Sequence, residues 1–378
     1  MTEQIVFPAF GGGADISSWS GTPYFMLRAA SAVDLPLVGV SVPAPQDMQG
    51  VRWLWRAWRL ATLRKAAGFT MSETCLSRTW DDARKFPAGT RVLSYFSLLS
   101  TRMLDRVERG EIELNYYIDM TYKEFIDQYP EGRNADPALT ERSFERERRG
   151  YRLAKRICSF TRSSADYICR EYGIAPEKVK VVRGGANIEA ALLEDEPASP
   201  RPTSPPFIIG FVGMDWKRKG LPLLATVLPR LRAAGHDVRL RVIGAAPPEI
   251  SAMEGVEFIG RVDKTREMAR YVALLRECSI GALLSDSEAM GMAGLEFLSV
   301  GVPVIGTAVG GLPDYITSDV GVLVPGGVSP DVLEQAITSL IDDPMRLQAL
   351  ADAAFRRRSE YHWSASMRQM RAVLNGHA

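Results

Sequence analysis

Short apolar runs of four to seven residues recur along the chain and alternate with longer segments whose apolar residues follow helical spacing. Runs of this length, bounded by glycine, proline or small polar residues, are typical of buried strands. In the first half they predict strands at Gln4–Phe10, Leu37–Val42, Val92–Phe96 and Leu114–Ile118, with helices at Thr22–Val33 and Arg52–Ala67.

The second half shows the same alternation with short connections. Its predicted strands are Phe207–Val212, Val238–Ile243, Val256–Ile259, Ile280–Leu284, Pro303–Thr307 and Val320–Val324, and its predicted helices are Leu221–Ala234, Lys264–Glu277, Gly291–Val300 and Pro330–Ile341. Strands that alternate with helices form parallel sheets, so the pattern predicts an α/β fold with two doubly wound, Rossmann-like parallel sheets. Such sheets bind ligands beyond the carboxyl ends of their strands, and we expect two domains that face one cleft.

A proline-rich segment separates the two halves. Residues 194–206 read EDEPASPRPTSPP, with five prolines and no apolar periodicity, which is typical of a linker. We therefore expect an amino-terminal domain at residues 1–198 and a carboxy-terminal domain at residues 206–360. The last segment, Pro344–Leu374, predicts two consecutive helices, and the second, at about 361–378, is expected to pack back on the amino-terminal domain.

Composition narrows the function classes. The chain has 46 basic and 45 acidic residues in 378, so its net charge of +1 gives no reason to expect nucleic acid as a partner. Its four cysteines are far apart and form no CxxC pair, which favours a reducing, cytoplasmic location. The first residues lack the pattern of a signal peptide, and no apolar run is long enough to span a bilayer.

Two segments of the second half carry candidate chemistry. The first, FIIGFVGMDWKRKG at Phe207–Gly220, places Arg218 and Lys219 between a strand and a helix, where cations can neutralise a diphosphate. A triplet of cations at 217–219 is also common in solvated loops. The second, from Ser285 to Ala308, places Glu288 and Glu296 on either side of a turn at Gly291 that opens a short helix. The backbone N–H groups of a helix start attract anions, so this segment suits a nucleotide sugar.

Each glutamate also has a plain structural interpretation, in which Glu288 lies beside a helix N-cap and Glu296 is an exposed helical residue. Apolar neighbours at Leu295, Phe297 and Leu298 favour instead a buried Glu296 that requires a partner. The sequence VGGLPD at Val309–Asp314 supplies two glycines where backbone approaches another group closely, or a turn before a helix that starts with proline.

Taken together, these motifs resemble the retaining glycosyltransferases of family four, which have the GT-B architecture. The resemblance is carried by Gly213…Lys219-Gly220, Glu288-x7-Glu296 with Gly291, Gly301-Val302-Pro303-Val304-Ile305, Val309–Asp314 and Val320–Pro325. It is weaker in the first half, where Ser18–Tyr24 looks like the family's glycine loop and Lys178–Asn187 like its domain-closing turn.

The resemblance implies a hexosyltransferase that needs neither cofactor nor metal and uses a nucleoside-diphosphate sugar as donor. It implies that Glu296 binds the ribose, that Glu288 holds the donor sugar, and that Arg218 and Lys219 grip the diphosphate. The remaining donor contacts that it implies come from Gly213, Ile259, Arg261, Ala289, Met290, Gly291 and Met292. On the acceptor side it implies the loop with Ser20 and Gly21.

Two features depart from the family pattern. Many members have an arginine directly after the strand glycine, whereas Gly213 is followed here by Met214, and Arg218 is the candidate replacement. Members often have a histidine near the donor sugar in the first domain, but the histidines here are His236, His362 and His377. Asp119, after the predicted strand Leu114–Ile118, is the candidate catalytic residue in that place, or the N-cap of the following helix.

The segment Val51–Lys65 is unusually rich in tryptophan and cations, with no acid. Such a composition suits a helix that lies on an anionic membrane surface, or an acceptor carried on a lipid. In the alternative interpretation, Leu54, Trp58 and Ala61, with Trp55 beside them, pack on the sheet while the arginines stay solvated. A second basic region, Arg142–Arg162, predicts an exposed helix with charge pairs such as Glu145–Arg149.

Three functions remain in competition on the sequence alone. The first is transfer of a hexose to a hydroxyl of a glycan or lipid-linked acceptor. The second is epimerisation of a nucleotide sugar, which the scarcity of histidine disfavours. The third is a subunit that binds nucleotide sugars without catalysis. A dinucleotide site at residues 11–13 is a weak option, because these glycines lack the GxGxxG spacing.

Overall fold

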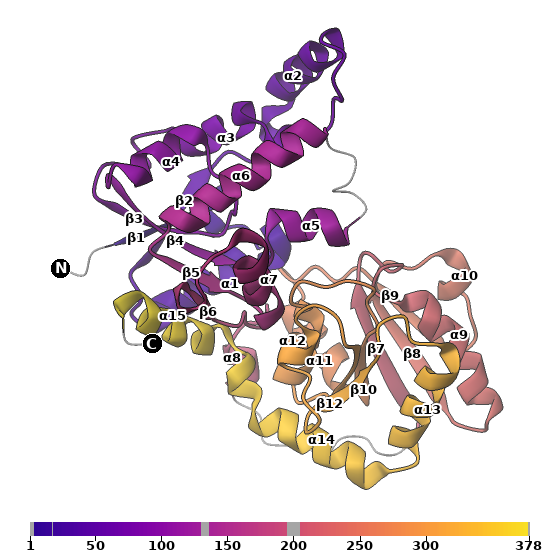
Figure 1. Ribbon diagram of the computed structural model, residues 1–378. Coiled ribbons are helices and arrows are strands. Elements are labelled where there is room, and N and C mark those ends of the chain that lie inside the picture. The colour runs from indigo at the N-terminus through magenta and orange to yellow at the C-terminus, as the bar shows by residue number, and fades with distance from the viewer. Residues whose placement is uncertain (1–3, 17, 130–135, 195–204, 377–378) are drawn as a thin grey trace. The chain divides into compact units, whose positions relative to one another are not determined.

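The computed structural model describes residues 4–16, 18–129, 136–194 and 205–376 and divides into two compact units (Figure 1). The first unit comprises Met1–Arg183 and Ser366–Ala378, and the second comprises Gly184–Ala365. The linker predicted at 194–206 falls almost entirely outside the described residues. The chain thus passes from the first unit to the second after Arg183 and returns to the first unit within its last helix.

The two ends of the second unit are joined to each other. The backbone N–H of Ala186 donates a hydrogen bond to the carbonyl oxygen of Tyr361 at 2.7 Å. The indole N–H of Trp363 donates to the side-chain oxygen of Asn187 at 2.8 Å. A Cβ on Gly185 would lie 2.3 Å from the backbone nitrogen of Trp363, so only glycine allows the two segments to lie this close.

The first unit contains a six-stranded parallel sheet in the order β2-β1-β3-β4-β5-β6. Its strands are β1 Ile5–Phe10, β2 Leu37–Val42, β3 Thr90–Ser94, β4 Ile112–Ile118, β5 Arg156–Ser159 and β6 Val179–Val181. The four strands predicted in this half are confirmed. The sequence pattern did not reveal β5 and β6, which are too short to show a periodicity of their own.

Helices connect these strands. They are α1 Thr22–Ala32, α2 Gln49–Ala61, α3 Glu73–Trp80, α4 Thr101–Glu108, α5 Tyr122–Gln128, α6 Pro137–Leu153 and α7 Arg162–Tyr172, with most of α15 Trp363–Asn375 added from the end of the chain. Five of them begin where a side-chain oxygen accepts a hydrogen bond from a backbone N–H of the first turn, at Ser72, Ser100, Thr121, Asp136 and Thr161. In Figure 1, α3, α4 and α6 lie on one side of the sheet and α15 on the other.

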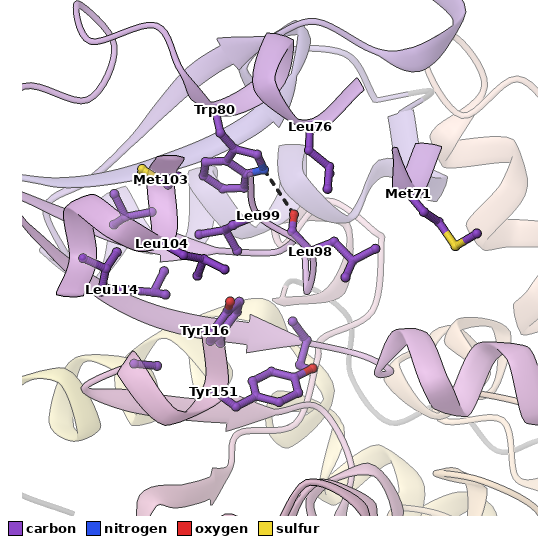
Figure 2. Close-up of a cluster of buried hydrophobic side chains, with 14 of the residues drawn as sticks. Met71, Leu76, Trp80, Leu98, Leu99, Met103, Leu104, Leu114, Tyr116 and Tyr151 are labelled. Carbon is purple, nitrogen blue, oxygen red and sulfur yellow. Dashed lines mark hydrogen bonds between the residues drawn. The ribbon is translucent and has the colours of Figure 1, made fainter. Parts of the chain in front are cut away.

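The core of the first unit is rich in aromatic residues. Trp80, Tyr116 and Tyr151 are almost completely buried, and Figure 2 shows them among leucines and methionines of α3, α4 and the strands. The indole N–H of Trp80 donates to the carbonyl oxygen of Leu98 at 3.1 Å, which satisfies the polar end of a side chain that otherwise contributes apolar area.

The second unit contains another six-stranded parallel sheet, in the order β12-β11-β10-β7-β8-β9. Its strands are β7 Phe207–Gly213, β8 Val238–Gly244, β9 Val256–Gly260, β10 Ile280–Leu283, β11 Val304–Thr307 and β12 Gly321–Val324. All six predicted strands are confirmed, and so is the α/β class with two doubly wound sheets. The order reverses between β7 and β10, and in the first unit between β1 and β3, so each sheet has a topological switch point at which ligands bind in such folds.

The helices of the second unit are α8 Ala191–Glu194, α9 Leu221–Ala233, α10 Pro248–Ser251, α11 Met268–Arg276, α12 Met292–Ser299, α13 Pro330–Ile341 and α14 Pro344–Arg356, followed by the start of α15. Helix α12 packs unusually close to the sheet. A Cβ on Gly281 of β10 would lie 2.3 Å from Phe297 Cδ2, and one on Gly210 of β7 would lie 2.8 Å from Phe297 Cζ. Two glycines therefore make room for the aromatic ring that holds α12.

Several predicted boundaries were wrong. Helix α11 starts at Met268 rather than Lys264, because residues 264–266 form a turn, and α2 ends at Ala61 rather than Ala67. The region Arg142–Arg162 is not one helix, since α6 ends at Leu153 and β5 follows. Within α6, Glu145 pairs with Arg148, and Arg149 pairs with Asp105 and Glu108 of α4. The two helices predicted near the end of the chain are present as α14 and α15.

None of the helices in the described ranges combines the length and the apolar character needed to span a lipid bilayer.

We predict that Gly281→Ala destabilises the second unit by about 3 kcal/mol, because the new methyl group overlaps a buried ring that cannot move away without displacing α12. Gly235→Ala is the matched control. Gly235 has a positive φ of 94° but nothing within 4 Å of a Cβ, so this change should cost only about 1 kcal/mol of backbone strain. Urea denaturation of both variants measures the difference, and an equal loss would contradict the close packing of α12.

Candidate functional site

The switch point of the second sheet brings two loops together. Strands β7 and β10 are neighbours and parallel, so the loops that follow them, 214–220 and 284–291, leave the sheet at the same edge. The backbone N–H of Asp286 donates to the carbonyl oxygen of Arg218 at 2.9 Å and joins the two loops directly. Both candidate segments identified in the sequence therefore meet at one place.

The first loop is a compact turn that ends at Gly220. The N–H of Lys219 donates to the carbonyl oxygen of Asp215 at 3.1 Å, and that of Leu221 donates to Trp216 at 3.0 Å. Gly220 has a φ of 79°, and a Cβ there would lie 2.3 Å from the carbonyl oxygen of Leu284. Both the backbone angle and the close approach thus require glycine at the start of α9.

Glu288 is a buried carboxylate with two cations beside it. Its side chain is 8% exposed and forms an ion pair with Arg218 Nη1, while Lys219 Nζ lies 3.7 Å from Glu288 Oε1. Arg218 also contacts Asp215 Oδ2 through Nε at 2.9 Å and donates to the carbonyl oxygen of Ser287 at 2.6 Å. Arg218 thus binds Glu288 and connects both loops. The ammonium of Lys219 is farther from the Glu288 carboxylate than a hydrogen bond allows. A carboxylate this deeply buried is stable only with such partners.

The start of α12 is shaped by a second set of close contacts. Gly291 is its N-cap with a φ of 73°, and the hydroxyl of Tyr315 donates to the carbonyl oxygen of Gly291 at 2.7 Å. A Cβ on Gly310 would lie only 1.7 Å from the carbonyl oxygen of Glu288. Gly310 therefore allows the predicted close approach of backbone to the loop that carries Glu288. Gly311 is the N-cap of the short 3-10 helix Leu312–Asp314 with its proline in the first turn, so the other interpretation of this segment holds as well. Tyr315 was not foreseen from the sequence.

Glu296 lies on the buried face of α12 and has two partners. Lys264 Nζ lies 2.5 Å from Glu296 Oε1, and the hydroxyl of Tyr271 donates to Oε2. The ammonium of Lys264 also lies 4.2 Å from the centre of the Tyr271 ring. Burial, and then the charge of Glu296, raise the pKa of Tyr271 well above its ordinary value, so the tyrosine is a proton donor to the carboxylate. The prediction that Glu296 is buried and paired is confirmed, and the alternative of an exposed residue is wrong.

The other candidate residues of this unit lie between the two glutamates in the sequence or at the ends of β7 and β9. Ala289 and Met292 are half-buried, and Met290 is buried. Gly213 is the last residue of β7. The side chain of Lys219 packs against it, since a Cβ on Gly213 would lie 2.4 Å from Lys219 Cδ. Ile259 in β9 is half-buried and Arg261 is exposed, three residues before the lysine that reaches Glu296. Lys264, in the turn after β9, thus contacts α12 through its hydrogen bond to Glu296.

In the first unit, Asp119 directly follows β4 and is half-buried. The hydroxyl of Tyr95 donates a hydrogen bond to its carboxylate, and burial raises the pKa of Asp119 from 3.8 to about 6. The alternative role of Asp119 as N-cap of the next helix is wrong. Thr121 is the N-cap of α5 and forms a capping box with Glu124.

Ser20 and Gly21 lie near the switch point between β1 and β3 of the first sheet. Both have positive φ, 58° and 89°, as does the preceding Trp19 at 50°. The Trp19 ring packs edge-on against Tyr95, with ring centres 4.8 Å apart. Tyr95 therefore contacts both Asp119 and Trp19, the residue before Ser20. Nothing in the sequence distinguishes Tyr95 from other tyrosines that follow a strand.

Within the described ranges, no cluster of three or more His, Cys, Asp or Glu side chains is arranged to hold a metal ion.

Comparison with known proteins finds a family model that matches part of the second unit. Residues 206–343 match the family model for glycosyl transferases group 1. The chain is 27% identical over 237 residues to D-inositol 3-phosphate glycosyltransferase 1 of Catenulispora acidiphila, covering 58% of this chain and 57% of that protein. It is 30% identical over 178 residues to a D-inositol 3-phosphate glycosyltransferase of Corynebacterium aurimucosum, covering 44% and 42%. The chain thus spans about half the length of these curated relatives.

Solved structures show the same fold over the whole chain. Sucrose-phosphate synthase from Thermosynechococcus elongatus superposes with a TM-score of 0.65 at 15% identity, covering 99% of this chain and 98% of that one. Anabaena HepE, solved in complex with UDP and glucose, superposes with a TM-score of 0.66 at 14% identity, covering 99% and 100%. The expected GT-B architecture of two Rossmann-like sheets is therefore confirmed.

We predict that Lys264→Met destabilises the second unit by about 3 kcal/mol, because it leaves the buried carboxylate of Glu296 without its cation. Adding Glu296→Gln to that variant should recover about half of the loss or more, since no buried charge then remains. Arg266→Met, at a position with an 86% exposed side chain, is the control and should change the free energy of unfolding by less than about 0.5 kcal/mol. Additive losses in the double variant would contradict the pairing.

We also predict a pH-dependent effect of Asp119→Asn. Between about pH 4 and 6 the folded chain keeps the proton of Asp119 while the unfolded chain has lost it, so stability falls as pH rises through this window. The asparagine of the variant has no proton that titrates in this range, so the stability of the variant lacks this pH dependence. Its free energy of unfolding relative to the unmodified chain should therefore increase from pH 4 to 6 and stay constant above. Urea denaturation at stepped pH measures this difference, and a difference independent of pH would show that Asp119 is not buried as described.

Proposed function

We propose that the chain transfers a hexose from a nucleoside-diphosphate sugar to a hydroxyl group of an acceptor, with retention of configuration and without a metal. The match of residues 206–343 to the model for glycosyl transferases group 1, together with the GT-B fold, supports this proposal. The observation that carries the proposal is the arrangement of Glu288, Arg218 and Lys219 at the switch point between β7 and β10, next to the start of α12. The carboxylate there can accept hydrogen bonds from hydroxyl groups, and the two cations can bind phosphates, so the site matches a ligand that has both.

The donor is proposed to lie across this switch point. Glu296 accepts the ribose hydroxyls, with Lys264 and Tyr271 fixing the carboxylate in one orientation. Glu288 accepts hydroxyls of the hexose, together with the backbone of Ala289–Met292. Bonds from hydroxyls to a charged carboxylate are worth about 1.5 to 3 kcal/mol each, which is enough to select a donor and orient it. Gly213, Ile259 and Arg261 complete the proposed contacts, the last two on the side of the base.

The diphosphate is proposed to lie against Arg218 and Lys219. Cleavage of the bond between the anomeric carbon and the diphosphate oxygen leaves an additional negative charge on that oxygen. Lys219 is the better placed of the two cations to neutralise it, because it is the less tightly held by Glu288. The acceptor oxygen forms the new bond on the face from which the diphosphate leaves, and the leaving phosphate oxygen takes the acceptor's proton. The protein acts mainly by orientation and by charge stabilisation.

The acceptor is proposed to bind at the switch point of the first sheet. Ser20 and Gly21 would contact it, and Asp119 would bind a hydroxyl of the reacting sugars. A carboxyl group with a pKa of about 6 can accept or donate a hydrogen bond near neutral pH, which suits an uncharged hydroxyl partner. The relatives' names refer to an inositol phosphate as acceptor, so a polyol, a glycan or a lipid-linked sugar is the class of acceptor that we propose.

A donor screen tests the function. UDP-, GDP- and ADP-sugars are incubated with the purified chain, and release of the nucleoside diphosphate is measured with and without EDTA. A transferase releases the nucleoside diphosphate slowly when water is the only acceptor and faster when a sugar acceptor is present. EDTA leaves both rates unchanged. Conversion of the sugar without release indicates an epimerase. Binding without either reaction indicates a binding subunit, and binding of none of the donors overturns the proposal.

We predict that Lys219→Met lowers kcat about 100-fold or more, because the cation acts on charge that develops only as the diphosphate leaves. Lys217→Met is the matched control. Lys217 is in the same loop but is exposed, with its ammonium 5.2 Å from the centre of the Trp216 ring, so its loss should change kcat less than about twofold. Glu296→Gln should instead raise the Kd of the nucleoside diphosphate about tenfold or more. Equal kcat values for both lysine variants would contradict the assigned role.

A further inference from the structure

Helix α2 has one face that packs on the first unit and an opposite face that does not. Trp55 and Arg59 are buried, and Val51, one turn before Trp55, is half-buried, which marks the packed face. Trp53, Leu54, Trp58 and Leu60 are 54% to 69% exposed, and Leu63, just beyond the helix, is 97% exposed. The sequence alternative that Leu54, Trp58 and Ala61 pack on the sheet is therefore wrong, and only Trp55, which it placed beside them, is buried. Figure 1 shows α2 at the far end of this unit, projecting past α3 and α6.

The packed face is held firmly, so the exposed face is a fixed surface. The Trp55 ring packs edge-on against Phe69, with centres 5.6 Å apart. The guanidinium of Arg59 lies over the Trp55 ring, contacts Asp136 at 2.8 Å, and donates to the carbonyl oxygen of Lys65 at 2.9 Å. Arg59 thus ties the helix, the residues after it and the N-cap of α6 together.

The exposed face is continuous and apolar. With 3.6 residues per turn, Leu60, Trp53, Ala57, Ala61, Leu54 and Trp58 follow one another around the side of the helix opposite Trp55. Large apolar side chains gathered on one exposed helical face are rare on soluble proteins unless something binds there. Arg52 and Arg56 border this face along one side.

The charge around this face has a single sign. Arg52, Arg56, Arg64 and Lys65 are exposed, and among the described residues none of the four has a carboxylate within ion-pairing distance. The guanidinium of Arg64 lies 5.6 Å from the centre of the Trp58 ring, at the border of the apolar face. Segment 49–65 contains no acid at all. The binding partner must therefore offer both an apolar interior and negative charge at its surface.

We propose that α2 docks the first unit on an anionic lipid bilayer, with Trp53, Leu54, Trp58 and Leu60 in the interfacial layer and the four exposed cations at the lipid phosphates. Tryptophan favours this layer because its ring is apolar and its N–H is polar. A helix with an apolar face, a cationic border and too few apolar residues to cross the bilayer lies in the plane of the interface. The proposal does not rest on the proposed function, because none of these residues belongs to the candidate site.

The experiment is co-sedimentation of the full chain with phosphatidylglycerol vesicles, phosphatidylcholine vesicles and mixtures of the two, at low and high salt. The chain should sediment with anionic vesicles, more weakly at high salt, and only slightly with neutral ones. Arg52→Glu combined with Arg56→Glu should weaken partitioning at least about 25-fold, at about fivefold per cation. Trp53→Ser combined with Trp58→Ser should weaken it at least about tenfold and abolish any blue shift of the tryptophan fluorescence on binding.

Matched controls come from the second unit, where Arg266→Glu and Met345→Ser change exposed residues of the same kinds and should leave sedimentation unchanged. Thermal unfolding checks that all variants fold, since the changed side chains are exposed. Equal binding to neutral and anionic vesicles, or equal loss in the controls, overturns the proposal. So does self-association of the chain that the tryptophan variant abolishes while vesicle binding is absent, because the face would then join two copies.

Discussion

The site in the second unit depends on one constraint: a carboxylate can be buried only if a cation reaches it. Glu288 and Glu296 stand on either side of the start of α12, and each is held by a residue from a loop that follows a different strand, Arg218 after β7 and Lys264 after β9. Because unpaired buried charges are so costly, these pairs fix the positions of the loops as much as the loops fix the pairs. The ion pairs therefore hold both carboxylates in defined orientations. Close backbone approaches at Gly220 and Gly310 leave the loops no other arrangement.

Much of the fold follows from the sequence, because buried parallel strands give continuous apolar runs and short connections leave few topologies. Every long strand was predicted on this basis, whereas β5 and β6, with four and three residues, carry too little pattern. The candidate segments at 207–220 and 285–296 were also found, since glycine at a strand end followed by charge is a local signal. The partners of Glu296 and of Asp119 were not. Lys264 lies 32 residues before the glutamate that it contacts, and Tyr271 and Tyr95 are ordinary tyrosines until the sheets place them. A pattern along the chain shows that Glu296 needs a partner, but only the packing of β9 and α11 shows which one.

The tryptophans of the first unit show the same difference between local and spatial information. The chain at 51–65 is compatible with two opposite orientations of its helix, because tryptophan and arginine serve equally well against a sheet or in water. Trp55 and Arg59 decide between them through the Phe69 ring and Asp136, contacts that join residues distant in the sequence. Because these two side chains are buried, helical geometry places Trp53 and Trp58 on the exposed side of the helix. The exposed apolar surface is thus a direct consequence of how the buried face is held.

The joined ends of the second unit have a consequence for how such a chain can change. Since the N–H of Ala186 is bonded to the carbonyl oxygen of Tyr361, the two crossings between units occur side by side, as in a domain inserted into the loop of a host. An inserted domain with adjacent ends can be replaced by another of the same geometry without disturbing the host's own sheet. Each unit could then be exchanged as a separate module. The interchangeable part would be the second unit, which begins at Gly184 and ends at Ala365. The prolines that mark a junction in the sequence are not its boundary.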